Sequence, residues 1–171
     1  VIYRVLGRAV FSLVIDEFRS IFSPLQFGVG FPNGCELIVH NIRRHLQLKP
    51  EDSIISIDCS NAFNTVHRQA ILEEVGLRVP SIAEFTNWAY GTPSDLLWKD
   101  STISSERGTK QGDPLGGALF CLALQRALES LQDLYPNLRI WAYMDDIHLG
   151  GDNATCLEAF DTLTGLLSDI G

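Results

Sequence analysis

Two short apolar runs, residues 139–143 and 147–149, are separated by only three residues, Met144, Asp145 and Asp146. Runs this short and this close together predict a tight β-hairpin, so the two adjacent carboxylates fall at its tip. Neighbouring like charges repel each other, and a bound divalent cation removes that penalty, because Mg2+ prefers carboxylate and phosphate oxygens. The pattern therefore leaves two interpretations open: a solvated turn, or a hairpin tip that binds metal.

A third carboxylate, Asp58, follows the apolar, β-branched run of residues 53–57. Such a run predicts a short buried strand, so Asp58 falls at a strand end. It could be a turn or helix-capping residue, or it could be a metal ligand. Asp58 and Asp145 lie 87 residues apart and could converge on one face of a sheet. Three carboxylates suit a pair of metal ions about 4 Å apart, which clamp the entering and leaving oxygens of a phosphoryl displacement.

Residues 108–114 read Gly-Thr-Lys-Gln-Gly-Asp-Pro and precede a long apolar run. The Asp-Pro pair predicts the start of a helix, and glycines allow the backbone to approach a ligand closely. Gln111, between the glycines, could belong to a plain helix start or could contact a ligand.

Phe63, five residues after Asp58, could be a core residue. Its ring could instead form the floor of a sugar pocket, where it would clash with a 2′-hydroxyl.

The remaining periodicity predicts an α+β fold in which an antiparallel sheet carries helices on one face. Helices are expected at residues 1–22, 34–48, 65–75, 80–90, 115–131 and 153–170, and a further pair of strands at 96–99 and 102–107. The apolar residues that define the first and the longest helix are Val5, Val10, Leu13, Val14, Phe18, Ile21 and Phe22, and Leu115, Leu119, Leu122, Leu124, Leu128 and Leu131. We expect Asn33, Thr65 and either Asp152 or Asn153 to cap helices, and Gly76 to follow the end of one.

Charge argues against a nucleic-acid-binding function if it is taken over the whole chain. The 171 residues carry 13 basic and 21 acidic side chains, a formal net charge of -8. Residues 1–50 have a net charge of +3, and residues 51–171 have a net charge of -11. Nucleic-acid-binding domains are usually basic. The objection weakens if some of the acids hold divalent cations and if a basic region lies outside this chain.

The four cysteines, Cys35, Cys59, Cys121 and Cys156, show no Cys-x-x-Cys spacing, so neither a zinc site nor a thioredoxin-like site is predicted. We expect buried, reduced thiols in an intracellular protein of the cytoplasm or nucleus. The longest uncharged apolar run, residues 114–125, has 12 residues, fewer than the ~20 of a membrane helix. No secretory signal opens the chain. Because its first residue is valine and its one methionine is internal, we expect it to be part of a longer or processed polypeptide.

Taken in order, these segments resemble the reverse transcriptase domain of non-LTR retrotransposons and related retroelements. Residues 56–66, Ser-Ile-Asp-Cys-Ser-Asn-Ala-Phe-Asn-Thr-Val, resemble that family's motif A. Residues 108–115 resemble motif B, and residues 142–146, Ala-Tyr-Met-Asp-Asp, resemble motif C. Residues 25–28 and 34–43 resemble the loop and helix that precede motif A. The order and the spacing agree, and the resemblance covers nearly the whole chain.

The resemblance implies a right-hand polymerase fold. Residues 1–50 would be helices of the fingers and of the fingers–palm junction, and residues 51–171 would be the palm, with motifs A, B and C and the start of motif D. The thumb would be absent, and the chain alone is expected to be inactive, because primer and template would have little to hold them. The activity implied is RNA-templated DNA synthesis by attack of a primer 3′-hydroxyl on a dNTP. The implied partners are an RNA template, a DNA primer and dNTPs, with no membrane; the oligomeric state stays open.

The resemblance also implies roles for individual residues. Asp58 and Asp145 would bind two Mg2+ ions, for which Mn2+ could substitute, with Asp146 beside them and a ligand from the backbone carbonyl of Cys59. The predicted nucleotide-binding residues are Cys59, Ser60, Asn61, Ala62, Phe63, Gln111 and Gly112. Among them, Asn61 and Ala62 would receive the triphosphate through their backbone, Phe63 would be the steric gate against rNTPs, and Gln111 and Gly112 would line the nascent base pair.

Three positions depart from the family pattern. Asn61 stands where a basic residue is usual, Asn64 where an acid is usual, and Gly116-Gly117 where Ser or Thr followed by Pro is common. Because the three aspartates, Phe63 and Gln111 remain, we interpret these changes as subfamily variation. The alternatives are an inactive relic of a retroelement and a non-catalytic, reverse transcriptase-like RNA-binding fragment.

Overall fold

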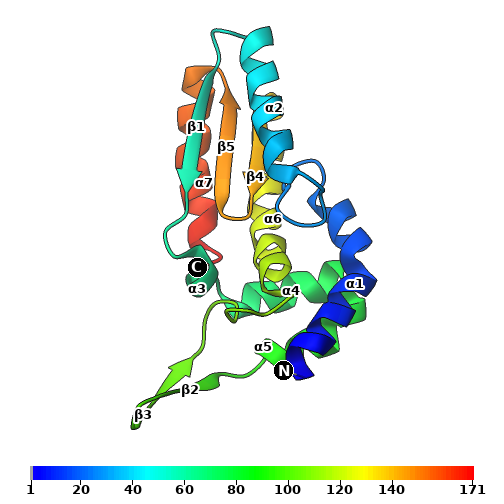
Figure 1. Cartoon of the computed structure of the whole chain (residues 1–171). Coiled ribbons are helices and arrows are strands. Elements are labelled where there is room, and N and C mark those ends of the chain that lie inside the picture. The colour runs from blue at the N-terminus through cyan, green and yellow to red at the C-terminus, as the bar shows by residue number, and fades with distance from the viewer. Residues whose placement is uncertain (1) are drawn as a thin grey trace.

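The computed structural model describes residues 2–171, so Val1, which falls in the first predicted helix, lies outside the described residues. Figure 1 shows an elongated molecule with a small sheet at one end and a group of helices at the other. The helices are α1 (Ile2–Phe22), α2 (Gly34–Leu48), α3 (Ala62–Thr65), α4 (Arg68–Arg78), α5 (Ala83–Tyr90, after a 3-10 turn at Pro80–Ile82), α6 (Gly116–Leu134) and α7 (Asn153–Ser168). The strands are β1 (Ser53–Asp58), β2 (Ser94–Trp98), β3 (Ser101–Ser105), β4 (Arg139–Tyr143) and β5 (Asp146–Gly151).

The main sheet has the order β1-β5-β4, and both of its pairings are antiparallel. Side chains alternate between its faces, so one face presents the apolar residues that join the core, among them Ile147 and Leu149. Helices α6 and α7 lie behind this face (Figure 1). Helix α2 packs on the opposite face along β4, where the His45 ring meets the edge of Trp141 with 5.6 Å between ring centroids. The predicted antiparallel sheet is confirmed, and α2 is an exception to the prediction that helices cover one face.

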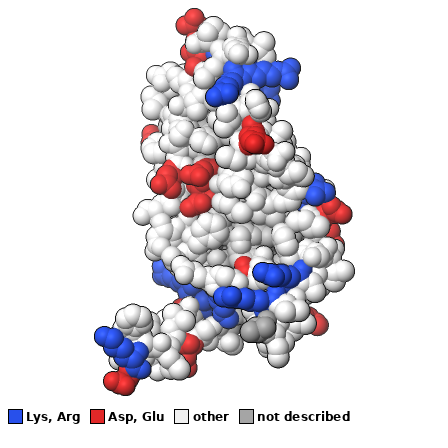
Figure 2. Space-filling model, in the orientation of Figure 1, with Lys and Arg blue, Asp and Glu red and all other residues white. Residues whose placement is uncertain are grey.

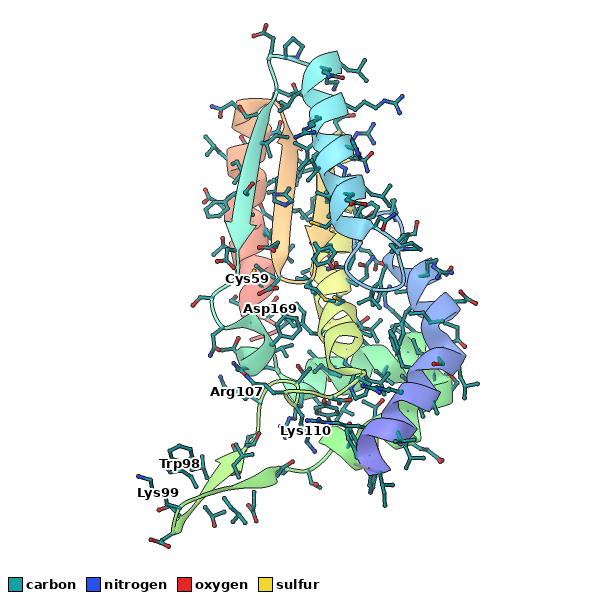
Figure 3. All side chains as sticks on the ribbon, viewed as in Figure 1. Cys59, Trp98, Lys99, Arg107, Lys110 and Asp169 are labelled. Atoms are coloured by element: carbon teal, nitrogen blue, oxygen red, sulfur yellow. The ribbon has the colours of Figure 1, made fainter. Side chains whose placement is uncertain are left out.

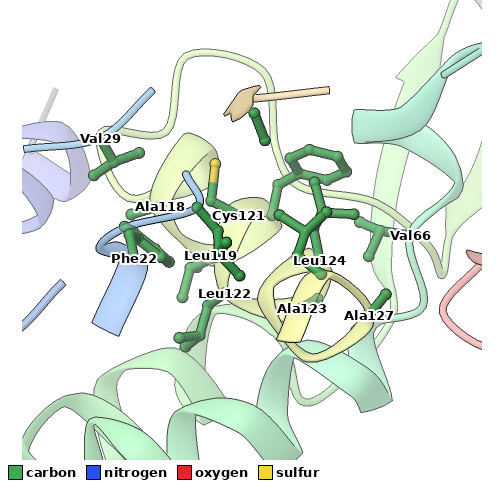
Figure 4. Close-up of a cluster of buried hydrophobic side chains, with 14 of the residues drawn as sticks. Phe22, Val29, Val66, Ala118, Leu119, Cys121, Leu122, Ala123, Leu124 and Ala127 are labelled. Atoms are coloured by element: carbon green, nitrogen blue, oxygen red, sulfur yellow. The ribbon is translucent and has the colours of Figure 1, made fainter. Parts of the chain in front are cut away.

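Helix α6 forms the centre of the hydrophobic core. Figure 4 shows its side chains packed against residues from α1, from the loop after α1 and from the segment after α3. All six leucines predicted to be buried are at most 1% exposed, and alanines and a cysteine on the other sides of the helix are buried too. The first half of α6, residues 118–125, is buried on all sides, so it must be surrounded by other elements and contacts both the sheet and the helices.

The strands β2 and β3 form a separate hairpin that projects away from the body (Figure 1). At its base, the buried Arg68 of α4 donates hydrogen bonds to the Ser105 carbonyl (2.7 Å), the Ser105 hydroxyl (2.9 Å) and the Gly108 carbonyl (3.1 Å). Burial lowers the pKa of Arg68 from its usual value. The hairpin was predicted, although its turn is one residue earlier than the expected one.

The predicted helix over residues 65–75 is wrong in its boundaries. The structure has a single turn, α3, and then the separate helix α4, with Val66 and His67 extended between them. Two long-range backbone hydrogen bonds account for the break. The Val66 carbonyl accepts from the Gly108 amide (2.8 Å), and the His67 amide donates to the Ile170 carbonyl (2.7 Å). Thr65 is therefore the last residue of α3 and caps nothing, and Gly76 lies inside α4.

Of the two other predicted caps, one is wrong and one is confirmed. Helix α2 begins where expected, but Asn33 has a left-handed φ of 56° and its side chain makes no capping hydrogen bond. In α7 the cap is Asp152, one of the two residues predicted, and its carboxylate accepts from the Thr155 amide (3.0 Å). That hydrogen bond lowers the pKa of Asp152.

Burial differs from expectation at four positions. Val5 and Leu13, in the apolar stripe predicted for the first helix, are 62% and 82% exposed. All four cysteines, which lie within the described residues, are free thiols, but only Cys121 and Cys156 are buried; Cys35 is exposed and Cys59 is half-buried. Over residues 2–171, no helix combines the length and the apolar character that crossing a membrane requires.

Candidate active site

The three aspartates singled out from the sequence lie at one end of the main sheet. Asp58, the last residue of β1, pairs across the strands with Asp146, the first residue of β5. Asp145 lies in the two-residue turn before it, so the hairpin is one residue tighter than predicted. Cross-strand neighbours of this kind have Cβ atoms roughly 5 Å apart and point to the same face. Figure 2 shows acidic side chains gathered over the end of the sheet where β4 turns into β5.

The three aspartates lie close enough to the half-buried Cys59 to affect the pKa of its thiol. Burial raises the pKa of Cys59 first of all, and the negative charges of Asp145, Asp58 and Asp146 raise it further. Within residues 2–171, however, no group of three or more His, Cys, Asp or Glu side chains is arranged so that it could hold a metal ion. The three carboxylates therefore lie around one sheet end as separate groups, each with the oxygen atoms that Mg2+ prefers.

The hairpin tip is fixed by a residue that sequence reasoning did not single out. Gln26 is fully buried, and its side-chain amide bonds both polar groups of Met144: Oε1 accepts from the Met144 amide (2.7 Å), and Nε2 donates to the Met144 carbonyl (3.0 Å). Met144 can therefore hold its left-handed φ of 56°, which is costly for a residue with a side chain. The sequence signal that could have pointed to Gln26 is that it is the one polar residue in the apolar segment 25–29.

The loop around Gln26 also joins the sheet. The Phe27 amide donates to the Ala142 carbonyl (2.7 Å), and the Ala142 amide donates to the Leu25 carbonyl (2.8 Å), which makes a short parallel bridge beside β4. Gly28 follows, and a Cβ there would lie 2.7 Å from the Met144 nitrogen. The turn that contains Asp145 is therefore fixed by the loop around Gln26, which lies more than 110 residues away in the chain.

A pocket of about 400 Å³ opens beside Asp145. Six of the predicted site residues line it: Asn61, Ala62, Phe63, Gln111, Gly112 and Asp145. Its other lining residues are Asn64, Thr109, Lys110, Asp113, Gly116 and Gly117. Cys59 and Ser60 line a smaller neighbouring cavity of about 70 Å³, together with the end of the chain, so the structure does not bring these two side chains into the main pocket.

Phe63 packs on the core, and its ring also lines the pocket. Its ring packs against the buried ring of Phe120 in α6, with centroids 4.4 Å apart, and one side of it lines the pocket. The residue is therefore attached to the core and presented to the pocket at the same time. A ring held in this way cannot move aside without losing its aromatic contact, worth about 0.5–1.5 kcal/mol beyond the buried area.

The two loops that flank the pocket are joined by their backbones. The Thr109 amide donates to the Phe63 carbonyl (2.8 Å), next to the bond between Gly108 and Val66. Gly108 has a φ of 72° and approaches the backbone of Asn64 closely. Gln111 and Phe63 therefore line the same pocket because the chain segments that carry them are hydrogen-bonded to each other.

Positive charge gathers beside the pocket although the chain is acidic overall. Arg4 of α1 reaches the loop so closely that a Cβ on Gly112 would lie 2.7 Å from its guanidinium. Lys110 lines the pocket, and burial, followed by the charge of Arg68, lowers the pKa of Lys110. Figure 3 shows Lys110 and Arg107 near the base of the projecting hairpin, and Figure 2 shows a band of basic side chains in the same region. Basic side chains therefore lie beside the pocket, whose own lining holds Lys110 together with Asp113 and Asp145.

The fold and the site define an α+β domain in which a strand pair presents carboxylates next to a polar pocket with a basic rim. The family model described as "Reverse transcriptase (RNA-dependent DNA polymerase)" matches residues 1–168 of this chain. The chain therefore belongs to the reverse transcriptase family, whose members carry out RNA-directed DNA synthesis, as the motifs predicted.

Two curated relatives are retrotransposon proteins. The chain is 31% identical over 143 residues to the retrotransposable element SLACS 132 kDa protein of Trypanosoma brucei gambiense, a match that covers 80% of this chain and 12% of the relative. It is 28% identical over 132 residues to the retrovirus-related Pol polyprotein from type-1 retrotransposable element R2 of Bradysia coprophila, covering 74% of this chain and 15% of the relative. The predicted non-LTR retrotransposon type is thereby confirmed. The chain matches less than a sixth of the length of either relative.

Proposed function

We propose that this chain forms the nucleotide-adding centre of a retroelement polymerase that copies RNA into DNA. Residues 51–171 would be the palm and residues 1–50 part of the fingers. The observation that carries the proposal is that Asp58 pairs with Asp146 across the strands, while the adjacent Asp145 lines the same pocket as Phe63 and Gln111. Carboxylates at a strand end beside a nucleotide-sized pocket suit phosphoryl transfer.

The aspartates would hold the divalent cations. Asp58 and Asp145, with the Cys59 carbonyl as a further ligand and Asp146 beside them, offer only oxygen atoms, which fits Mg2+ or Mn2+. When bound, two such ions would stabilise charge on the entering and leaving oxygens of the displacement. The chain itself would hold the aspartate oxygens in place. The β1–β5 pairing positions Asp58 and Asp146, and the hydrogen bonds of Gln26 to Met144 position the turn with Asp145.

The pocket residues would bind and select the dNTP. Phe63, braced by Phe120, would exclude a 2′-hydroxyl, and Gln111 and Gly112 would line the base pair that forms between the dNTP and an RNA template. Asn61, with a left-handed φ of 56°, and Ala62 would turn their backbone toward the triphosphate. The basic rim, which includes Arg4 and Lys110, would favour the phosphates of dNTP, template and primer.

Primer extension on an RNA template, in the full-length polypeptide that carries this chain, tests the proposal. Asp145→Asn removes a ligand charge without changing side-chain size, and we expect dNTP incorporation to fall at least about a hundredfold. Asp161→Asn, at an exposed position of α7 that does not line the pocket, is the matched control and should extend like the wild type. Both variants should keep the wild-type thermal unfolding midpoint.

The outcomes separate the proposal from its alternatives. Turnover retained in Asp145→Asn would remove the metal assignment. An inactive relic or a non-catalytic RNA-binding fragment predicts no extension by the wild type either, under conditions in which another reverse transcriptase extends the same primer.

A further inference from the structure

One carboxylate outside the acidic hairpin is contacted from three parts of the chain. Asp113 Oδ2 accepts hydrogen bonds from the hydroxyl of Tyr3 in α1 (2.7 Å) and from the hydroxyl of Tyr90 at the end of α5. Its Oδ1 accepts from the Leu115 amide (3.0 Å), in the turn that leads into α6. From the sequence, Asp113 was expected only to precede Pro114 at the start of a helix. The structure gives it a further role, in joining α1 and α5 to the pocket loop.

Tyr90 holds both residues that flank the exposed pair Gln111 and Gly112. Its hydroxyl donates to Asp113 on one side of the pair and accepts from the Lys110 amide (3.1 Å) on the other. The Lys110 carbonyl accepts from the Asp113 amide (3.0 Å), which closes the loop on itself. The position of the exposed pair is therefore set by one hydroxyl group buried behind it.

The surroundings of Tyr90 make this hydroxyl a fixed point. The residue is 2% exposed. The Arg68 guanidinium lies over its ring at 5.5 Å from the centroid and the Lys110 ammonium at 5.4 Å. Lys110 also donates to the Ala89 carbonyl (2.7 Å). Cations over an aromatic face stabilise the ring where it stands, and burial raises the pKa of Tyr90, so it stays a neutral donor.

Helix α1 completes the arrangement. The Tyr3 ring stacks on Phe85 of α5 with centroids 6.0 Å apart, and a Cβ on Gly7 would lie 3.3 Å from the Pro114 ring. The N-terminal helix, which holds no predicted catalytic residue, thus packs directly on the segment that follows Gly112. This close packing gives Tyr3 its approach to Asp113.

We propose that Tyr90 and Asp113 are positioning residues that set the geometry of the Gln111–Gly112 loop for nucleotide binding, with Tyr3 as a secondary support. The inference rests on the proposed function, since it assigns that loop to the dNTP pocket. Neither Tyr90 nor Asp113 needs to touch the reacting atoms. Their loss changes where Gln111 stands, so it affects the binding of dNTP more than the rate of the bound complex.

The test is Tyr90→Phe in the full-length polypeptide, which deletes one hydroxyl and keeps the buried ring. We expect the KM for dNTP to rise about tenfold, the effect of one hydrogen bond to a charged group, with kcat changed much less. Amide hydrogen exchange of residues 110–113 should become faster, because the Lys110 amide loses its acceptor. Tyr135→Phe is the matched control: it deletes a hydroxyl that bonds Thr162 (2.9 Å), away from the pocket, and should leave both readouts unchanged.

Tyr3→Phe gives a milder perturbation, since it removes one donor to Asp113 and leaves the Tyr90 bond. A smaller rise in KM and in loop exchange is expected, and it keeps the test open if Tyr90→Phe does not fold. Wild-type values of KM and exchange in the tyrosine variants would overturn the inference, as would an equal effect in Tyr135→Phe, which would indicate general destabilisation. If the wild type incorporates no dNTP, the proposed function has failed, and loop exchange alone decides whether Tyr90 positions the loop.

Discussion

Replacing Gly108 by alanine should damage the molecule where the two pocket loops meet. Gly108 has a left-handed φ of 72°, and a Cβ there would lie 2.6 Å from both the Asn64 Cα and the Phe63 carbonyl oxygen. Both of these are backbone atoms, which cannot rotate away as a side chain does. The amide of Gly108 also donates to Val66, so the loop cannot move without losing that bond.

Two costs add up in Gly108→Ala. Placing a residue with a Cβ in the left-handed region costs about 1–2 kcal/mol of folding free energy. Forcing extra atoms into a packed site typically costs about 1–3 kcal/mol more. We therefore expect the free energy of unfolding to fall by about 2–5 kcal/mol. Any relaxation would move Phe63 and Asn64 away from the Gln111 loop, so the KM for dNTP should rise as well.

Urea denaturation monitored by circular dichroism measures the fall in the free energy of unfolding. The chain also offers a control substitution that should raise this free energy. Gly76 is exposed inside α4, and a Cβ there would meet nothing within 4 Å. Gly76→Ala should therefore stabilise the protein by about 0.5–1 kcal/mol. If Gly108→Ala unfolds within about 0.5 kcal/mol of the wild type while Gly76→Ala stabilises, the loops are not joined as the structure has them.

Two further substitutions test the pocket and the core. Phe63→Val should admit rNTPs, because it removes the ring that would meet a 2′-hydroxyl; the ratio of kcat/KM for dNTP and rNTP checks this, and an unchanged ratio would remove the gate role. Leu119→Ala, at a position with 0% exposure near the start of α6, should lower the free energy of unfolding by about 2–5 kcal/mol. Denaturation of that variant measures the loss, and a value below 1 kcal/mol would contradict the central place of α6 in the core.

The helices and the hairpin could be predicted because their signals are local. The apolar run after Pro114 predicts α6, and the short distance between two apolar runs predicts the turn at Asp145. The break between α3 and α4 could not be predicted, since it depends on hydrogen bonds from Val66 and His67 to residues 42 and 103 positions away. Long-range backbone pairing of this kind overrides local helix propensity and leaves no pattern in the segment itself.

The same reasoning explains which site residues were found. The three aspartates and Phe63 belong to contiguous motifs, so the resemblance pointed to them directly. Gln26 and Tyr90 act on those motifs from outside them: Gln26 holds the Asp145 turn, and Tyr90 holds the residues on both sides of Gln111. A supporting residue is defined by what its side chain meets in the fold, so only the structure could assign it.

The pocket therefore depends on contacts that cross the molecule. The Asp145 turn is fixed by the loop after α1, the Gln111 loop by α1 and α5, and Phe63 by α6. Each support is buried or half-buried, and each belongs to a different part of the core. Mutations in these supports should consequently alter nucleotide binding before they unfold the protein, whereas mutations of the buried α6 leucines, none of which lines the pocket, should do the reverse. Comparing dNTP KM with the unfolding midpoint across the two groups of variants separates these behaviours, and a single shared trend would mean that the pocket has no supports of its own.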